Sequence, residues 1–170
     1  KEAEKVIRVA DERAKAAGVT LTAEYPDCTG KPLVGEPLYL RQIMMNIITN
    51  AIKYSNKGST VNISVFEAPD PENKDRAEIR FICEDHGIGM SREFQEKMFE
   101  PFAREGQAAN GRFDGVGLGL AIVKKLVGGQ NGTIDVQSEK GKGTRFEITL
   151  LYKYSSGELP EQKAETQTPA

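Results

Sequence analysis

The stretch PLYLRQIMMNIITNAIKY, residues 37–54, is the most regular part of this sequence and predicts a long helix. At about 100° per residue, the apolar side chains gather on one side, and they are Leu40, Ile43, Met44, Ile47, Ile48 and Ala51. The polar side chains gather on the other side, and they are Gln42, Asn46, Thr49, Asn50 and Lys53. Pro37 suits the first helical turn. We therefore expect one face of this helix to pack on a core and the other to form a polar stripe.

The polar stripe has an ordinary interpretation and a functional one. Asn and Lys on a helix surface usually face water. However, Asn46, Asn50 and Lys53 are spaced so that they point the same way, and asparagine is a poorer helix former than the residues that usually fill a plain surface. Amide oxygens can ligate a hard cation such as Mg²⁺, and an ammonium group can bind phosphate oxygens. The stripe therefore favours a wall that holds metal and phosphate.

The segment Asp85-His86-Gly87-Ile88-Gly89 follows an apolar, strand-like run. Its plain interpretation is a tight turn with glycines at positive φ. Its functional interpretation is that Asp85, at a strand end in a mostly apolar pocket, accepts a hydrogen bond from the exocyclic amine of adenine, which guanine lacks at that position. His86 is the only histidine, and a single histidine without a cluster of Cys or His cannot form a metal site.

The glycine run Gly115-Val116-Gly117-Leu118-Gly119 comes just before a second apolar helical stretch. It is not the dinucleotide-binding fingerprint, because Leu120 stands at the third glycine position and an irregular loop precedes it. A flexible hinge would explain the glycines alone. A glycine-rich helix start also offers backbone amides and the helix dipole to phosphate. Three separate stretches thus suit the base, the metal ion and the phosphates, and together they imply an ATP site.

Hydrophobic periodicity predicts the remaining elements. Further helices are expected at 1–17, 91–98 and 117–127. Strands with alternating apolar residues are expected at 19–24, 33–34, 60–67, 76–85, 133–138 and 144–150. The stretch 103–115 is rich in Gly, Ala, Gln and Asn without periodicity, and we expect it to be a mobile loop.

The 170 residues, 38% of them hydrophobic, are enough for one sizeable core but few for two domains. We expect one domain at 1–154 and a disordered polar tail at 155–170. Lys and Arg number 23 and Asp and Glu 25, so the formal net charge of -2 argues against a nucleic-acid partner.

The two cysteines, Cys28 and Cys83, are expected to be reduced thiols, because no dense cysteine framework is present. No apolar run approaches the ~20 residues of a spanning helix, and no signal-peptide pattern opens the sequence. We therefore expect a cytoplasmic domain without direct membrane contact. Because the first residues already look helical, we expect a fragment of a longer protein, whose other parts can include a membrane anchor.

Five motifs in order resemble those of the catalytic ATP-binding domain of bacterial sensor histidine kinases, within the superfamily shared with gyrase-type and MutL-type ATPases. They are residues 46–54 for the N box, 85–90 for the G1 box, 99–102 for the F box, 115–122 for the G2 box and 141–144 for the final glycine motif. The resemblance extends from about residue 18 to residue 152. It implies an α/β sandwich of the Bergerat type, in which a mixed β-sheet carries α-helices layered on one face.

The resemblance also implies roles for individual residues. Catalytic roles are implied for Asn46, Lys53 and Arg104, with Asn46 as the Mg²⁺ ligand. Contacts with ATP are implied for Asn50, Tyr54, Asp85, Gly87, Gly89, Phe102, Gly115, Gly117, Leu118, Gly119 and Thr144. Asp85 would read the adenine amine, and the loop 103–115 would be the ATP lid, which nucleotide orders.

One position distinguishes a kinase from an ATPase. Asn46 stands where gyrase-type members carry a glutamate that activates water, and an amide cannot take a proton. The resemblance therefore implies transfer of the γ-phosphate to a histidine on a helical dimerisation domain, and from there to the receiver domain of a response regulator. No His-Glu or His-Asp pair occurs in the sequence, so we expect the acceptor outside it. A serine kinase of the anti-sigma-factor type and a non-catalytic nucleotide-sensing module remain alternatives.

Overall fold

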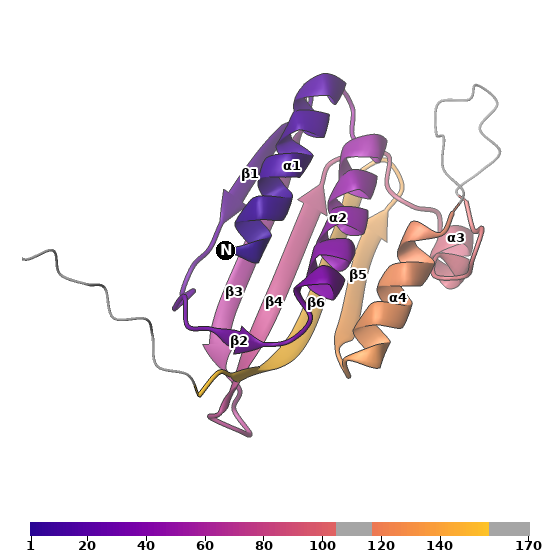
Figure 1. Cartoon of the computed structure of the whole chain (residues 1–170). Helices are drawn as coiled ribbons and strands as arrows, with labels where there is room; N and C mark the ends of the chain where they lie inside the picture. The colour runs from indigo at the N-terminus through magenta and orange to yellow at the C-terminus, as the bar shows by residue number, and fades with distance from the viewer. Residues whose placement is uncertain (105–116, 157–170) are drawn as a thin grey trace, which may run out of the picture.

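Helix α2, Pro37–Tyr54, lies across one face of a mixed sheet in this computed structural model, which describes residues 1–104 and 117–156 (Figure 1). The other helices are α1, Glu2–Ala17, α3, Arg92–Lys97, and α4, Gly119–Gly129. The strands are β1, Thr20–Glu24, β2, Leu33–Val34, β3, Thr60–Pro69, β4, Arg76–Asp85, β5, Thr133–Glu139, and β6, Gly143–Tyr154. Each of these elements overlaps a stretch where the sequence predicted its type, although β6 continues to Tyr154, beyond the predicted end at residue 150.

The described strands form one six-stranded sheet in the order β1-β3-β4-β6-β2, and β5 also pairs with β6. Strands β1 and β3 are parallel, with α2 in the connection between them, and every other pair is antiparallel. In the register of the sheet, Asp85 at the end of β4 lies between Val61 of β3 and Thr144 of β6. The final turn of α2 reaches the same end of the sheet, because Ile88 N–H donates to the Tyr54 carbonyl oxygen over 3.1 Å.

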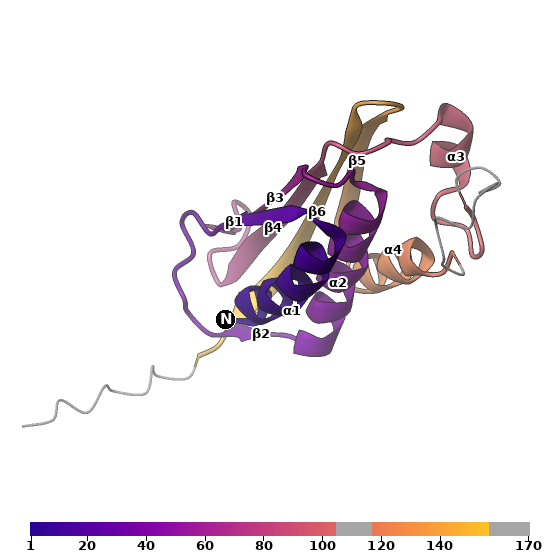
Figure 2. The same ribbon diagram turned by 90° about the horizontal axis from the view of Figure 1, so that it is seen from above.

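Alternation along the strands separates a buried face from a polar face. On β3 and β4 the buried apolar side chains are Val61, Ile63, Val65, Ala77, Ile79, Phe81 and Cys83. Helices α1, α2 and α4 lie on this same side of the sheet, as the view from above shows (Figure 2). The opposite face carries polar pairs such as Arg80 with Glu147 at 3.4 Å and Arg145 with Glu147 at 2.9 Å. The predicted α/β sandwich with helices on one face of a mixed sheet is confirmed.

The structure departs from the predicted elements mainly at their ends. Strand β3 continues to Pro69 because Ala68 and Pro69 extend its ladder with β4. Helix α4 begins at Gly119 rather than at residue 117. In α2, Leu40 is only partly buried, whereas Ile52 is buried, because it follows Ile48 by four residues and shares its stripe.

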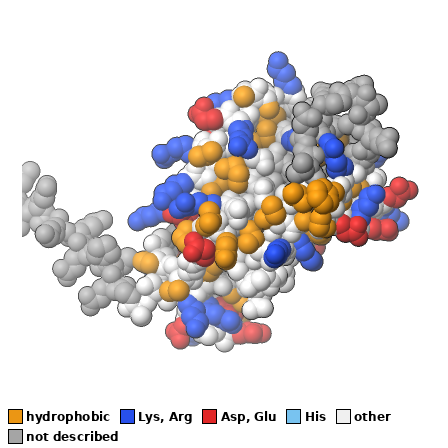
Figure 3. All heavy atoms as spheres, turned by 45° about the vertical axis from the view of Figure 1, so that its right-hand side comes forward, with side chains coloured by type: hydrophobic (Ala, Val, Ile, Leu, Met, Phe, Trp, Pro, Cys, Tyr) orange, Lys and Arg blue, Asp and Glu red, His pale blue; other side chains and the backbone are white. Residues whose placement is uncertain are grey.

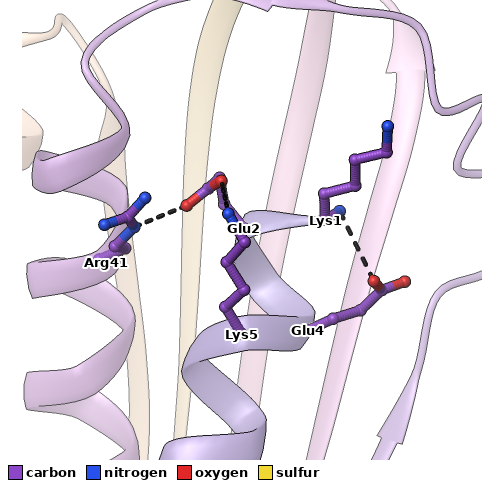
Figure 4. A network of polar contacts seen from close by, with 5 residues as sticks. All are labelled: Lys1, Glu2, Glu4, Lys5 and Arg41. Carbon is purple, nitrogen blue, oxygen red and sulfur yellow. Dashed lines mark hydrogen bonds and ion pairs between the residues drawn. The ribbon is translucent and has the colours of Figure 1, made fainter.

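The N-terminal helix is joined to α2 by a small ionic network (Figure 4). Glu2 binds Lys5 Nζ at 2.9 Å and Arg41 Nε at 2.6 Å. These hydrogen bonds, first from Lys5 and then from Arg41, lower the pKa of Glu2 to about 2. Because Lys5 and Arg41 are exposed and Glu2 is only partly buried, the network contributes little to the stability of the fold. Helix α1 ends at Ala17, and Gly18 follows it in the left-handed conformation, φ 71°, which lets the N–H groups of Gly18 and Val19 both cap the last carbonyls.

Ile47 lies where α2 meets the core, and its side chain is 0% exposed. We expect Ile47→Val to lower the free energy of unfolding by about 0.5–1.5 kcal/mol, because it removes one methylene from a close-packed site. Ile122 of α4 provides the matched control, since its side chain is 39% exposed. Urea titrations should show almost no loss for Ile122→Val. Equal losses in both variants would contradict the assignment of Ile47 to the core.

None of the helices within residues 1–104 and 117–156 is both long and apolar enough to cross a lipid bilayer. The predicted polar tail, 155–170, lies outside the described residues except at its start. There, Ser155 N–H donates to the Pro32 carbonyl oxygen over 2.9 Å.

Candidate functional site

A cavity of about 170 Å³ opens at the end of the sheet where α2 and β4 finish and β6 begins. The predicted site residues that line it are Asn50, Lys53, Tyr54, Asp85, Gly89, Arg104, Gly117, Leu118, Gly119 and Thr144. These residues come from five separate parts of the sequence. The fold therefore brings together the three stretches that sequence analysis singled out.

Asp85 is the buried acidic group of this cavity, with a side chain that is 8% exposed. Gly87 N–H donates to Asp85 Oδ1 over 2.9 Å, and the backbone amide of Thr144 also donates to the carboxylate. Burial raises the pKa of Asp85, and these two amide hydrogen bonds oppose that rise. Since a carboxylate has about four lone-pair positions, Asp85 keeps capacity to accept from a ligand in the cavity.

The glycines after Asp85 are required by close backbone contacts. A Cβ on Gly87 would lie 2.1 Å from the Tyr54 carbonyl oxygen, and a Cβ on Gly89 would lie 2.1 Å from that of Glu139. Gly89 also has a positive φ of 65°. Gly141 N–H donates to the Ile88 carbonyl oxygen over 2.7 Å, which fixes the loop to the β5–β6 turn. Gly87 thus lies behind the cavity wall, where it positions Asp85.

The polar stripe of α2 runs along the cavity towards the start of α4. Asn50 and Lys53 line the cavity. Asn46 is not among the lining residues, but its Oδ1 atom would lie 3.7 Å from a Cβ placed on Gly119. Leu118 occupies the N-cap position of α4 and gives no side-chain cap. The first backbone N–H groups of α4 therefore have no side-chain cap. They lie beside the side-chain amide of Asn46, and an uncapped helix N-terminus suits an anion.

The segment after α3 is held against the start of α4. Phe102 N–H donates to the Gly117 carbonyl oxygen over 3.0 Å. Gly117 needs its glycine there, because it has a φ of 76° and a Cβ on it would lie 2.7 Å from the Ala103 carbonyl oxygen. Phe102 itself has a φ of 65° and a ring that is 69% exposed, and it does not line the cavity.

Parts of the predicted site lie outside the described residues. Of the predicted ATP lid, 103–115, the structure describes Ala103 and Arg104, and both line the cavity. Gly115 lies outside the described residues.

The sequence indicated a mostly apolar pocket around Asp85 but not which residues form its walls, and these are Ala51, Ile88, Met90, Phe94, Met98, Leu120 and Phe146. Two patterns could have identified some of them. Phe94 of α3 and Met98, the C-cap residue of that helix, are four residues apart, so they share a face. Ile88 and Met90 alternate with glycines in the loop after Asp85. A pocket with apolar walls and a few polar groups is typical of a nucleotide base site.

Hydrophobic side chains are also exposed on the side of the molecule that carries α3 and α4 (Figure 3). The large ones with the most exposure there are Phe102 and Ile122. Lys124 Nζ lies 5.3 Å from the centroid of the Phe99 ring.

The narrow space between Asn46 and Gly119 provides a test of the site. We expect Gly119→Ala to fold, because the added methyl group would be in ordinary van der Waals contact at 3.7 Å. It should nevertheless weaken ATP binding about five- to tenfold, because it fills space beside the amide. In the control variant, Gly128→Ala, the added methyl group meets nothing within 4 Å, and titration should show unchanged affinity. Wild-type affinity in Gly119→Ala would remove this gap from the ATP site.

Comparison with known proteins identifies the family. Residues 35–153 match the model of the histidine kinase-, DNA gyrase B- and HSP90-like ATPases. The chain is 34% identical over 153 residues to the sensor histidine kinase AtsR of Burkholderia thailandensis, a match that covers 89% of this chain and 24% of AtsR. It is 38% identical over 136 residues to the sensor-like histidine kinase SenX3 of Mycobacterium tuberculosis, covering 78% of this chain and 32% of SenX3. The chain thus spans about a quarter to a third of the length of these relatives.

Solved structures agree with this match. The mycobacterial sensor histidine kinase MprB superposes with a TM-score of 0.66 at 25% identity, covering 90% of this chain and 96% of that chain. Full-length ShkA in complex with AMPPNP shares the fold, with a TM-score of 0.71 at 24% identity, covering 93% of this chain and 31% of that chain. The chain belongs to the histidine kinase-, DNA gyrase B- and HSP90-like ATPase family, and it is a catalytic ATP-binding domain of the sensor histidine kinases of two-component signalling.

Proposed function

We propose that this domain binds Mg²⁺-ATP in the cavity and transfers the γ-phosphate to a histidine on a helical dimerisation domain of the same protein. That histidine then passes the phosphoryl group to an aspartate in the receiver domain of a response regulator. The observation that carries the proposal is the arrangement of the cavity, in which a buried acceptor, Asp85, shares one space with the cationic Lys53 and Arg104.

The Asp85 end of the cavity suits adenine. A purine there would lie among apolar side chains such as Met90, Met98 and Phe146. Its 6-amino group can donate to the Asp85 carboxylate, which already holds two backbone amides and is therefore fixed in position. Guanine presents a carbonyl oxygen at the same place, and that oxygen would face the carboxylate without a proton between them.

The other end of the cavity suits a triphosphate with Mg²⁺. Asn46 and Asn50 offer neutral amide oxygens, which are ligands that Mg²⁺ accepts together with phosphate oxygens and water. Lys53 and Arg104 bring positive charge, and the uncapped start of α4 brings backbone amides. A bound Mg²⁺ would neutralise negative charge on the phosphates. The donors present therefore fit this ion, and Asn46 is the proposed ligand.

The kind of phosphoryl acceptor is inferred from the side chains that line the cavity within residues 1–104 and 117–156. The only carboxylate among its described lining residues is Asp85, which is committed to two backbone amides and to the base. Asn46 cannot accept a proton from water. A nucleophile that attacks without an added base is therefore favoured, such as an imidazole nitrogen, which forms a P–N bond as the bond between the γ-phosphorus and ADP breaks.

The proposed substrate also bears on the cellular location and the partners of the domain. Because ATP is its substrate, we propose that the domain works in the cytoplasm. The full protein can carry a membrane anchor outside this chain. Of the two cysteines, Cys28 is exposed and Cys83 is buried, and both are free thiols, which fits a reducing compartment. We propose that the domain itself contacts neither nucleic acid nor membrane.

The direct test is a transfer assay with ATP labelled at the γ-phosphate. The domain should label the helical domain of its own protein, and acid should remove the label, because a phosphoramidate is acid-labile. Acid-stable label on a partner would instead support the serine-kinase alternative. Binding of ATP without any transfer, even in the full-length protein, would support the nucleotide-sensing alternative and contradict the proposal.

A further inference from the structure

Ser138 of β5 lies at the centre of a hydrogen-bond network behind the cavity. Its Oγ atom accepts from Met90 N–H over 2.9 Å. The same atom lies 3.0 Å from the Gly143 carbonyl oxygen and 2.8 Å from Thr144 Oγ1. Met90 and Thr144 both line the cavity, whereas Ser138 does not. The serine therefore touches two parts of the wall from behind.

The positions of the protons follow from the number of donors. A serine hydroxyl has one proton and two lone pairs. The Gly143 carbonyl oxygen cannot donate, so the contact between Ser138 and Gly143 uses the serine proton. Met90 N–H fills one lone pair of Ser138 Oγ. The remaining contact can then be satisfied only if the Thr144 hydroxyl donates its proton to the second lone pair of Ser138.

This arrangement fixes what Thr144 offers to a ligand. Its only hydroxyl proton points to Ser138, so towards the cavity it has lone pairs alone. Its neighbour across the β-ladder, Asp85, likewise offers only acceptor positions when it is ionised. The wall at this end of the cavity is therefore a pair of acceptors, which matches a ligand edge that carries protons and mismatches one that carries a carbonyl oxygen.

We propose that Ser138 is a positioning residue that holds the Thr144 hydroxyl as an acceptor and thereby selects a 6-amino purine over a 6-oxo purine. The proposal rests on the nucleotide site described above. A 6-amino group has two protons and donates one to Asp85 and the other to Thr144. Without Ser138, the Thr144 hydroxyl can rotate and donate to a 6-oxo group, so the selection weakens.

Gln95 of α3 belongs to the same network but does not affect the hydroxyl protons. Its Nε2 atom donates to the Met90 carbonyl oxygen over 3.0 Å and to the Ser138 carbonyl oxygen over 3.2 Å. It therefore fastens α3 to the cavity wall through backbone groups. A change at Gln95 disturbs packing there while the contact between Ser138 and Thr144 stays intact, which makes it a matched control.

The test compares, by calorimetric titration, the affinities of ATP and inosine triphosphate, whose purines carry a 6-amino group and a 6-oxo group with a proton on N1, respectively. Ser138→Ala should lower the ratio of the two affinities about tenfold, the usual size of one mismatched buried hydrogen bond. The separate variant Ser138→Thr, which keeps the hydroxyl, should have the wild-type ratio. Gln95→Met should leave the ratio at its wild-type value even if it weakens both nucleotides.

A second variant shows whether the effect passes through Thr144. Thr144→Val should lower the ratio by itself, and adding Ser138→Ala to it should change the ratio no further. A wild-type ratio in Ser138→Ala or in Thr144→Val would overturn the inference, and so would a further fall in the double variant. A loss of ratio in Gln95→Met as large as that in Ser138→Ala would also overturn it. If the wild-type domain bound no ATP at all, the proposed function itself would fail.

Discussion

The Asp85→Asn variant is expected to lose most of its affinity for ATP, about 1–3 kcal/mol or roughly 5- to 150-fold. The amide oxygen of asparagine can still accept from Gly87 N–H. Its amide nitrogen, however, would face the amino group of adenine, so two donors would meet in a buried place. The loss should be largest for ATP and smaller for a purine without the 6-amino group. Calorimetric titration measures both affinities.

Glu84→Gln is the matched control for this variant. Glu84 is the preceding residue of β4, and by the strand alternation its side chain lies on the opposite, polar face of the sheet. Removing its charge should leave ATP affinity at the wild-type value. An unchanged affinity in Asp85→Asn, or an equal loss in Glu84→Gln, would remove Asp85 from the base site.

Asp85 also makes ATP affinity depend on pH, and its raised pKa gives the direction of that dependence. Burial raises the pKa of Asp85 above its ordinary value of 3.8, so protonation begins at a higher pH than for an exposed aspartate. ATP affinity should fall as pH falls through this raised pKa, because a protonated carboxyl group loses acceptor capacity. The stability of the nucleotide-free domain should change in the opposite sense, since a raised pKa in the folded state favours folding at low pH and that contribution is lost as pH rises. Both dependences should flatten in Asp85→Asn.

Asn46→Ala is expected to lower the rate of phosphoryl transfer about 100-fold, because it removes the proposed Mg²⁺ ligand beside the start of α4. Asn46 is only partly buried and does not belong to the core, so the fold should persist. The variant should lose the part of ATP affinity that depends on Mg²⁺. It should keep the part that remains when the ion is chelated.

Gln42→Ala tests whether the polar stripe acts through Asn46 in particular. Gln42 lies one turn earlier on the same side of α2 and is exposed. Transfer and metal dependence should both match the wild type in this variant. Equal behaviour of Asn46→Ala and the wild type, measured by transfer to the helical domain with and without Mg²⁺, would contradict the role given to Asn46.

Much of the fold could be predicted because its elements carry local signals. The 3.6-residue period of α2 and the alternation in β4 mark a buried face whether or not the partner elements are known. The family resemblance is confirmed by the match over residues 35–153. The sheet order could not be predicted in this way, because pairing of β6 with β4 and β2 depends on contacts between residues distant in the sequence.

The candidate site also has a part that could be predicted from the sequence and a part that could not. Asp85, Asn50 and Lys53 could be named from type and spacing, and the structure brings them to one cavity. The exposed ring of Phe102 could not be foreseen, because its direction depends on a positive φ that the contact with Gly117 maintains. Ser138 also escaped prediction, since a serine in an ordinary strand carries no local sign of the hydrogen bonds that distant residues provide.

The ATP site is tested most directly by a calorimetric titration of the purified wild-type domain with ATP in the presence and absence of Mg²⁺. Saturable binding of one nucleotide per chain is expected, strengthened by Mg²⁺ and largely lost in Asp85→Asn. The absence of saturable binding in the wild type, or binding that Asp85→Asn leaves unchanged, would contradict the assignment of the cavity as an ATP site.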